Sequence, residues 1–123
     1  MQTKFNSLPD WDFVGGETQC RTFELYESDG MRVCDIPGAV CEMAVVDFIN
    51  QDSQNRLLKS ATITNDENGN TCFVTVSLSP SDTVSMSGKY LYQLTIKDAK
   101  GNITAPRGIM RVYKNIDRDF LTR

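Results

Sequence analysis

Apolar and polar residues alternate along most of this chain from Thr18 onward, and turn sequences interrupt the alternation. This period of two is the pattern of β-strands that bury one face. The segment TQCRTFELYE places Phe23 and Leu25 on one face and ends at the turn sequence SDG, residues 28–30. We therefore expect the first long strand here.

A second turn sequence, IPG at residues 36–38, precedes the segment AVCEMAVVDF. This segment places Cys41, Met43 and Val45 on the side opposite Glu42. Its content of β-branched and aromatic residues favours a strand over a helix.

The segment LLKSATITNDENGNTCFVTVSLS predicts two strands joined by a tight hairpin turn at Asn68-Gly69. Asn-Gly readily supplies the positive φ angles that such a turn requires. The outward residues are mostly Thr and Ser, as on a solvated sheet face. The predicted inward residues are Ala61, Ile63, Cys72, Val74, Val76 and Leu78.

Ser79 and Pro80 are placed like the cap and first residue of one short helical turn, where the chain crosses between two sheets. The next strand, KYLYQLTIKD, points Tyr90, Tyr92, Leu94 and Ile96 one way. Tyr90 is placed like the corner tyrosine of an immunoglobulin-type sandwich, whose hydroxyl bonds upstream backbone. Tyr92 occupies the position of the second core cysteine of an antibody domain, and we expect it in the core.

The segments ITAP and GIMRVYKN complete a count of about seven strands. The sequence therefore predicts an all-β fold, an immunoglobulin-like antiparallel β-sandwich of about seven strands with one short helical turn. Its 123 residues suit one domain. We expect an N-terminal arm over residues 1–16, the β-sandwich domain over residues 17–116 and a C-terminal tail over residues 117–123.

The amino-acid composition restricts the classes of partner that this protein can bind. The chain is 40% hydrophobic and 24% charged, with a formal net charge of -3 and no long run of like charges. Nucleic-acid binding needs clustered Lys and Arg, so we expect no nucleic-acid partner. The start of the sequence shows no secretory signal pattern and no segment reaches membrane-spanning length. We therefore expect synthesis in the cytoplasm and no membrane insertion.

The four cysteines, Cys20, Cys34, Cys41 and Cys72, are expected to be reduced. Two disulfides in any of three pairings are the alternative. A domain of this size builds its own core, and nothing signals export, which favours free thiols.

The chain contains no histidine, which removes Ser-His and Cys-His catalysis and the commonest zinc ligand. The cysteines lack paired CxxC spacing, so we expect no metal and no cofactor. Residues 65–70, NDENGN, lack the glycine and glutamate that a hand-type calcium loop needs next, and a solvated turn is the preferred interpretation. Scattered carboxylates could be paired by folding into an acid and base couple, although surface acids are the ordinary explanation. They are Asp10, Asp12, Glu17, Asp35 and Asp47.

The single tryptophan, Trp11, lies in LPDWDFVGG, among Pro and Gly residues rather than in an expected strand. Two interpretations are open: Trp11 folds back to close one end of the core, or it makes an assembly contact. Phe120 and Leu121 form an apolar pair near the C-terminus. The candidate interface residues are therefore Trp11, Phe13, Phe120 and Leu121.

The order of segments FVGGETQCRTFELYESDG, IPGAV, LLKSATITNDENGNTCFVTVSLSPSDT and MSGKYLYQLTIKDAKGNITAPRGIMRVYKNI resembles the N-terminal domain family of phage baseplate upper proteins. Its markers are the SDG turn, the IPGA element and the GKYLYQLTIKDAKG unit. The resemblance implies an immunoglobulin-like domain that helps attach receptor-binding parts to the tail of phages or prophages of Gram-positive bacteria. It assigns no individual binding residue.

The resemblance implies a structural component without catalysis, made in the bacterial cytoplasm and working in the virion. Its partners would be other tail or baseplate proteins and, because closed symmetric assemblies are the rule, further copies of itself. The alternative is a recognition module for a glycan or protein, with Trp11, Tyr26 or Tyr113 as stacking platforms.

Overall fold

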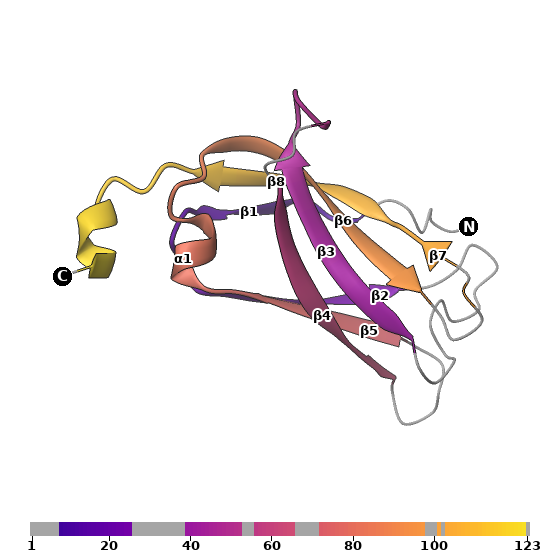
Figure 1. Ribbon diagram of the computed structural model, residues 1–123. Helices are drawn as coiled ribbons and strands as arrows, with labels where there is room; N and C mark the ends of the chain where they lie inside the picture. Colours follow the sequence, from indigo (N-terminus) through magenta and orange to yellow (C-terminus); the bar gives the residue numbers. More distant parts are fainter. Residues whose placement is uncertain are drawn as a thin grey trace.

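The computed structural model describes residues 8–25, 39–52, 56–65, 72–97, 101 and 103–122. These ranges contain eight strands, one α-helical turn and one 3-10 helix (Figure 1). In chain order they are β1 Trp11–Val14, β2 Gln19–Leu25, β3 Val40–Asp47, β4 Leu57–Asn65, β5 Cys72–Leu78, α1 Pro80–Thr83, β6 Gly88–Lys97, β7 Ile103–Thr104, β8 Arg107–Tyr113 and η1 Arg118–Thr122.

The predicted fold class is confirmed: the protein is an all-β, immunoglobulin-like sandwich with one short helical turn. The strands follow the order β1-β8-β6-β3-β4-β5-β2, and the short β7 pairs with β6. All pairings are antiparallel except that of β1 with β8, which is parallel. We call β1, β8, β6 and β3 the first layer and β5 and β2 the second.

Strand β4 belongs to both layers. Its first half, residues 57–61, pairs with β3 along one edge, and its second half, residues 62–65, pairs with β5 along the other. The two layers are thus two parts of one curled sheet, and β4 diverges from β5 toward α1 (Figure 1). We call this divergence, between residues 57–61 of β4 and 76–78 of β5, the fork.

The N-terminal arm expected over residues 1–16 is wrong in its second half. Residues 11–14 form β1, an edge strand of the first layer, and the amide of Leu8 donates to the carbonyl of Arg107 at 2.6 Å. The sandwich therefore begins by Leu8. The sequence WDFV does alternate, but Pro9, Gly15 and Gly16 around it favoured an irregular segment over a strand.

The core lies between the layers and contains the residues that alternation predicted. Inward positions of β3 and β6 are almost fully buried, as are those of β5. Ala61 and Ile63 of β4 pack against them partly buried. The turn predicted at residues 68–69, the SDG turn and the IPG break lie outside the described residues, as does the Cys72 side chain.

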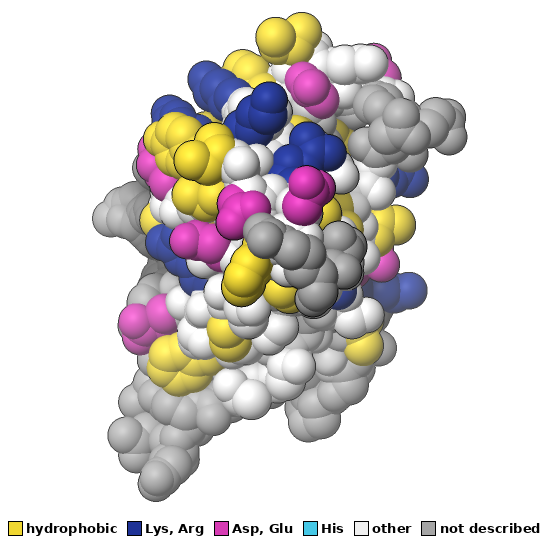
Figure 2. Space-filling view, turned by 90° about the vertical axis from the view of Figure 1, so that its left-hand side faces the viewer, with side chains coloured by type: hydrophobic (Ala, Val, Ile, Leu, Met, Phe, Trp, Pro, Cys, Tyr) yellow, Lys and Arg dark blue, Asp and Glu magenta, His cyan; other side chains and the backbone are white. Residues whose placement is uncertain are grey.

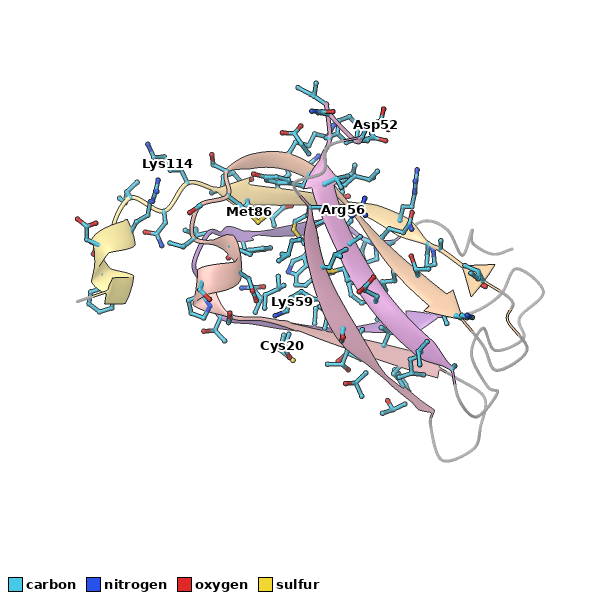
Figure 3. The ribbon with its side chains drawn as sticks, in the orientation of Figure 1. Cys20, Asp52, Arg56, Lys59, Met86 and Lys114 are labelled. Carbon is cyan, nitrogen blue, oxygen red and sulfur yellow. The ribbon has the colours of Figure 1, made fainter. Side chains whose placement is uncertain are left out.

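Helix α1 carries the chain from the second layer to the first, as predicted from Ser79 and Pro80. Ser79 is the N-cap, and its amide donates to the Asp82 carboxylate at 2.7 Å. The same carboxylate forms an ion pair with Lys59, whose Nζ lies 3.0 Å from Asp82 Oδ2. Lys59 points from β4 toward α1 (Figure 3), so this contact closes the α1 end of the fork.

Tyr90 is the predicted corner tyrosine. Its hydroxyl donates to the Ser87 carbonyl at 3.2 Å and accepts from the Ser87 amide at 3.0 Å. The two bonds hold the bend by which the chain enters β6.

Tyr92 is the centre of the core and is completely buried, as expected. Its ring packs edge-on against Trp11, with centroids 5.7 Å apart, and lies 5.8 Å from the ring of Phe23. Across the ladder it faces Gly108, where an added Cβ would lie 2.8 Å from the Tyr92 ring. Gly108 therefore makes room for the tyrosine that replaces a cysteine here.

We expect Gly108→Ala to lower the free energy of unfolding by about 1–3 kcal/mol, the usual cost of overpacking a core. Chemical denaturation measures the change. The matched control is the same substitution in a Tyr92→Leu background, which removes the ring. There the added cost of Gly108→Ala should shrink, and strictly additive costs would contradict the steric explanation.

Burial acts to raise the pKa of Asp82, but the hydrogen bonds from Ser79 and Lys59 outweigh it and hold that pKa below its usual value. The unfolded chain then binds more protons than the folded one in acid. The contribution of this carboxylate is therefore present above the ordinary pKa of an aspartate, about 3.9, and is lost as the pH falls through the lower folded pKa.

We expect Asp82→Asn to lower the free energy of unfolding by about 0.5–2 kcal/mol at neutral pH. The loss of stability between about pH 5 and pH 2 should also be shallower in the variant than in the wild type. Urea denaturation across this pH range checks both. Parallel profiles for the two proteins would show that Asp82 makes no titrating contribution.

Candidate interaction surfaces

Two of the four residues predicted at an interface lie in the chain's own core. Trp11 is 2% exposed and Phe13 5%, because β1 pairs with β8 and points both rings between the layers. They offer no surface to a partner, so the interface prediction is corrected for both. The alternative interpretation, that Trp11 packs into the core, is confirmed, although Trp11 lies within strand β1 and beside Tyr92 rather than at one end of the core.

Side chains join the edges of the two layers where no backbone ladder is described between β1 and β2. The Trp11 indole donates to the Gln19 side-chain oxygen at 3.0 Å. The Arg21 guanidinium lies over the rings of Trp11 and Phe23, at 5.6 and 5.5 Å from their centroids, and donates to the Asp10 carbonyl at 3.1 Å. This side of the core is thereby covered.

The Tyr92 hydroxyl makes a structural hydrogen bond and does not act as an acid. Its hydroxyl donates to the Pro9 carbonyl. Burial raises the pKa of Tyr92 strongly, nearby Arg21 acts to lower it, and Asp10 acts to raise it. The group therefore stays protonated across the physiological range.

The described carboxylates that were considered for an acid and base couple are all bound by other groups. Arg111 lies between two of them, 2.9 Å from Asp10 and 3.6 Å from Asp12. Its hydrogen bond to Asp10 raises the Arg111 pKa, which keeps the cluster an ion pair network. Glu17 accepts from the Val14 amide, Asp47 accepts from the amides of Ile49 and Asn50, and Asp35 lies outside the described residues.

The outward face of the first layer carries a groove of about 350 Å³ that is lined by both apolar and polar side chains. Its floor consists of Ala44 and Val46 on β3, Leu58 on β4 and Leu91 on β6, and we call it the outer groove. The other lining residues are polar: Glu42, Gln51, Arg56, Gln93 and Arg107. Gln93 pairs directly with Ala44 between β6 and β3, and its side-chain oxygen accepts from Arg107 at 2.9 Å.

Sequence reasoning missed the outer groove. An antiparallel sheet with one face in water usually carries polar residues there. The signal was present: in VCEMAVVD and KYLYQLTIK both faces of each strand carry apolar residues. Taking only the inward face of each strand left the outward residues unexplained.

Exposed apolar side chains also occur in residues 114–122, which we call the C-terminal segment. It continues beyond β8 and projects from the sandwich (Figure 1), and Lys114 is labelled at its start in Figure 3. Ile116 is 97% exposed and Phe120 66%. Phe120 thus remains a predicted interface residue, whereas the side chain of Leu121 lies outside the described part of the chain.

The root of the C-terminal segment is fixed to the sandwich. The Asn115 side chain donates to the Gly15 carbonyl at 2.7 Å, and its oxygen accepts from the Asp117 amide at 2.7 Å. Figure 2 faces the end of the molecule from which this segment leaves, and apolar side chains lie there among basic and acidic ones.

No group of three or more metal-ligating side chains occurs among the residues that the structure describes. Residues 66–70 of the calcium-like sequence are outside them. Among the described helices none is long and apolar enough to cross a membrane.

No family model and no curated protein matches this chain. Among solved structures it is similar to AggA, the major subunit of aggregative adherence fimbriae type I of Escherichia coli. The identity is 14% over 85% of this chain and 90% of that one, with a TM-score of 0.47. It is also similar to InlP of Listeria monocytogenes, at 20% identity over 86% of this chain and 26% of that one, with a TM-score of 0.43.

A third similar structure is a predicted glycoside hydrolase of Bacteroides vulgatus. The identity is 7% over 87% of this chain and 17% of that one, with a TM-score of 0.45. This chain thus spans about a quarter and about a sixth of the second and third structures. With all three TM-scores below one half, these likenesses carry no argument about function.

Two of the four cysteines are described, and both are free thiols in different surroundings. Cys41 is buried between the layers, and burial followed by the nearby Glu42 charge raises the pKa of its thiol to about 12. Cys20 is exposed, with the Ser77 hydroxyl 3.6 Å from its sulfur. Thiolate is the reactive form, so Cys20 should react far faster than Cys41.

We expect thiol titration of the denatured, unreduced protein to find four free groups, because the sequence favours a reduced protein. In the folded protein, Cys20→Ser should remove a fast-reacting group and Cys41→Ser a slow one. Two or no thiols after denaturation would overturn the reduced state. Equal rates for Cys20 and Cys41 would contradict the difference in burial.

Proposed function

We propose that this protein is a non-enzymatic structural module that works through protein–protein contacts. The observation that carries the proposal is the presence of exposed apolar side chains on two surfaces, Leu58 in the outer groove and Ile116 and Phe120 in the C-terminal segment. Apolar surface rimmed by polar residues is characteristic of interaction sites. The absence of histidine and the arginine between Asp10 and Asp12 also favour assembly over catalysis.

More specifically, we propose a component of a phage tail or baseplate, made in the bacterial cytoplasm and active in the virion. The support is the segment order, which resembles the N-terminal domain family of phage baseplate upper proteins. The GKYLYQLTIK part of that pattern is strand β6, with its corner tyrosine. Its partners would be other tail proteins and further copies of this chain.

A second candidate function is recognition of a glycan or protein by exposed aromatic side chains. One observation favours it: Tyr113 is 54% exposed on the outward face of β8. Trp11 does not serve as a platform because it is buried, and Tyr26 lies outside the described residues. Saturable binding on a glycan array, abolished by Tyr113→Ala, would favour this candidate.

We expect the purified protein to co-elute with at least one tail protein encoded beside it, in size-exclusion chromatography with light scattering. Leu91→Lys should weaken that complex, because it places a charge in the outer groove. Thr95→Lys is the matched control, four residues further along β6 on the same face and outside the groove. A strictly monomeric protein that every tail partner ignores would refute the structural function.

A further inference from the structure

We infer that the outer groove binds an acidic segment of a partner protein. The segment is extended and carries two carboxylates four residues apart, with an apolar side chain midway between them. The two arginines that line the groove, Arg56 and Arg107, receive the carboxylates. This partner chemistry rests on the proposed function and specifies what a protein partner presents to this surface.

Basic residues gather on the outward face of the first layer, although the chain as a whole is acidic. Its formal net charge is -3, from thirteen basic and sixteen acidic residues. The outward face carries five basic and three acidic residues, so it is positive while the rest of the chain is negative. The basic residues are Arg56, Lys89, Lys97, Arg107 and Arg111, and the acidic residues are Asp10, Asp12 and Glu42.

Most of the negative charge on this face is neutralised within the chain. Asp10 and Asp12 both lie against Arg111, at 2.9 and 3.6 Å. Among the described residues that line the groove, Glu42 is the only acidic one, and two are arginines. A surface of this sign attracts carboxylates and repels basic partners.

The groove runs across the strands rather than along them. Its lining begins with Arg107 on β8, continues over β6 and β3, and ends with Leu58 on β4 and Arg56 just before it. Figure 3 labels Arg56 at this end of β4. In the strand order β8-β6-β3-β4, the two ends of the groove are three strand spacings apart. Three spacings are about 14 Å.

An extended segment has the repeat that this separation requires. Four residues of an extended chain span about 14 Å, and every second side chain points to the same side. Side chains one, three and five of the segment therefore face the groove together. Carboxylates at one and five reach the two arginines, and the side chain at three lies over the floor between them.

Arg107 is held in position to bind a carboxylate. Its Nε donates to the Gln93 side-chain oxygen at 2.9 Å, and the Gln93 amide nitrogen donates to the Thr95 hydroxyl at 2.9 Å. These bonds orient the guanidinium and use one of its five N–H donors. The fork of a guanidinium fits the two oxygens of a carboxylate, and such charged hydrogen bonds are roughly twice as strong as neutral ones.

The floor between the arginines suits one apolar side chain. Val46 pairs directly with Leu91, and Ala44 pairs with Leu58, which is 47% exposed. Side chains on neighbouring strands are close enough to form one surface. A lysine at position 91 would place its charge beneath the apolar residue of the segment rather than beside either carboxylate, so Leu91→Lys disfavours this partner as well.

Fluorescence anisotropy of labelled peptides with the full chain tests the inference. The probe has the core Glu-Ser-Leu-Ser-Glu between glycine residues, and we expect it to bind saturably. Lys-Ser-Leu-Ser-Lys reverses the charges and should not bind. Glu-Ser-Leu-Glu-Ser keeps the composition but places the carboxylates on opposite sides of an extended chain, and should bind about threefold or more weakly.

Substitutions in the groove locate the binding. Arg56→Gln and Arg107→Gln should each weaken binding of the probe about three- to tenfold, the range of an exposed charged contact. The matched control Lys97→Gln removes the same charge from the outward face of β6 outside the groove, and should change binding less than about twofold. All three side chains are exposed, and circular dichroism with thermal unfolding checks that each variant is folded.

Three results would overturn the inference. The first is equal binding of the probe and the Lys-Ser-Leu-Ser-Lys peptide, and the second is a probe affinity that neither arginine substitution lowers. The third is binding of a DNA duplex or of polygalacturonate as tightly as the probe, with the same loss in both arginine variants. The groove would then recognise negative charge in general rather than an acidic protein segment.

The outcome also separates this inference from the proposed function. A chain that does not bind the probe but co-elutes with a tail protein overturns the acidic segment and leaves the structural function standing. A chain that binds the probe through both arginines but has no tail partner supports the inference and removes the assignment to a baseplate.

Discussion

The architecture depends on the way strand β4 divides its backbone hydrogen bonds. One edge pairs with β3 over residues 57–61 and the other with β5 over residues 62–65, so the sheet curls over on itself. The change of partner leaves the fork between β4 and β5, whose backbone lacks a ladder in the described part of the chain. Helix α1 lies at its open end, where the ion pair of Asp82 with Lys59 compensates the charge of an inward-facing lysine.

On the opposite side, the sandwich is closed by side chains instead of a ladder. Trp11 packs against Phe13, Phe23 and Tyr92, and Phe23 also packs against Tyr92. Arg21 lies over the rings of Trp11 and Phe23. Aromatic pairs with tilted rings contribute about 0.5–1.5 kcal/mol beyond the area that they bury. The N-terminal strand is therefore an integral part of the core and also fixes the start of the C-terminal segment, through Gly15.

Most of the strands could be predicted from the sequence because period-two alternation has a direct cause, the burial of one face. Met43, Val74 and Leu94 were assigned to the core on this basis, and all three are fully buried. The helical turn was predicted from its Ser-Pro start. The corner tyrosine was predicted from the position of Tyr90 at the start of an alternating strand.

What the sequence did not reveal depends on contacts between distant residues. The parallel partner of β1 lies about a hundred residues further along the chain, as does the partner of Asp10, Arg111. The outer groove was missed for another reason: alternation identified the inward faces of β3 and β6, and the apolar residues on their outward faces, Ala44, Val46 and Leu91, were left without a role. Phe120 could be placed near the terminus, but its exposure depends on the direction in which the chain leaves β8.

The burial of Cys41 affects how readily this fold is oxidised. A thiol that rarely ionises presents little nucleophile to peroxide or to a disulfide, and oxidation follows thiolate character and access. Because this side chain is 7% exposed and its pKa is raised, the thiol should react slowly both in a reducing cell interior and in oxygenated medium. At this position the core needs neither an oxidising enzyme to mature nor a reductant to persist.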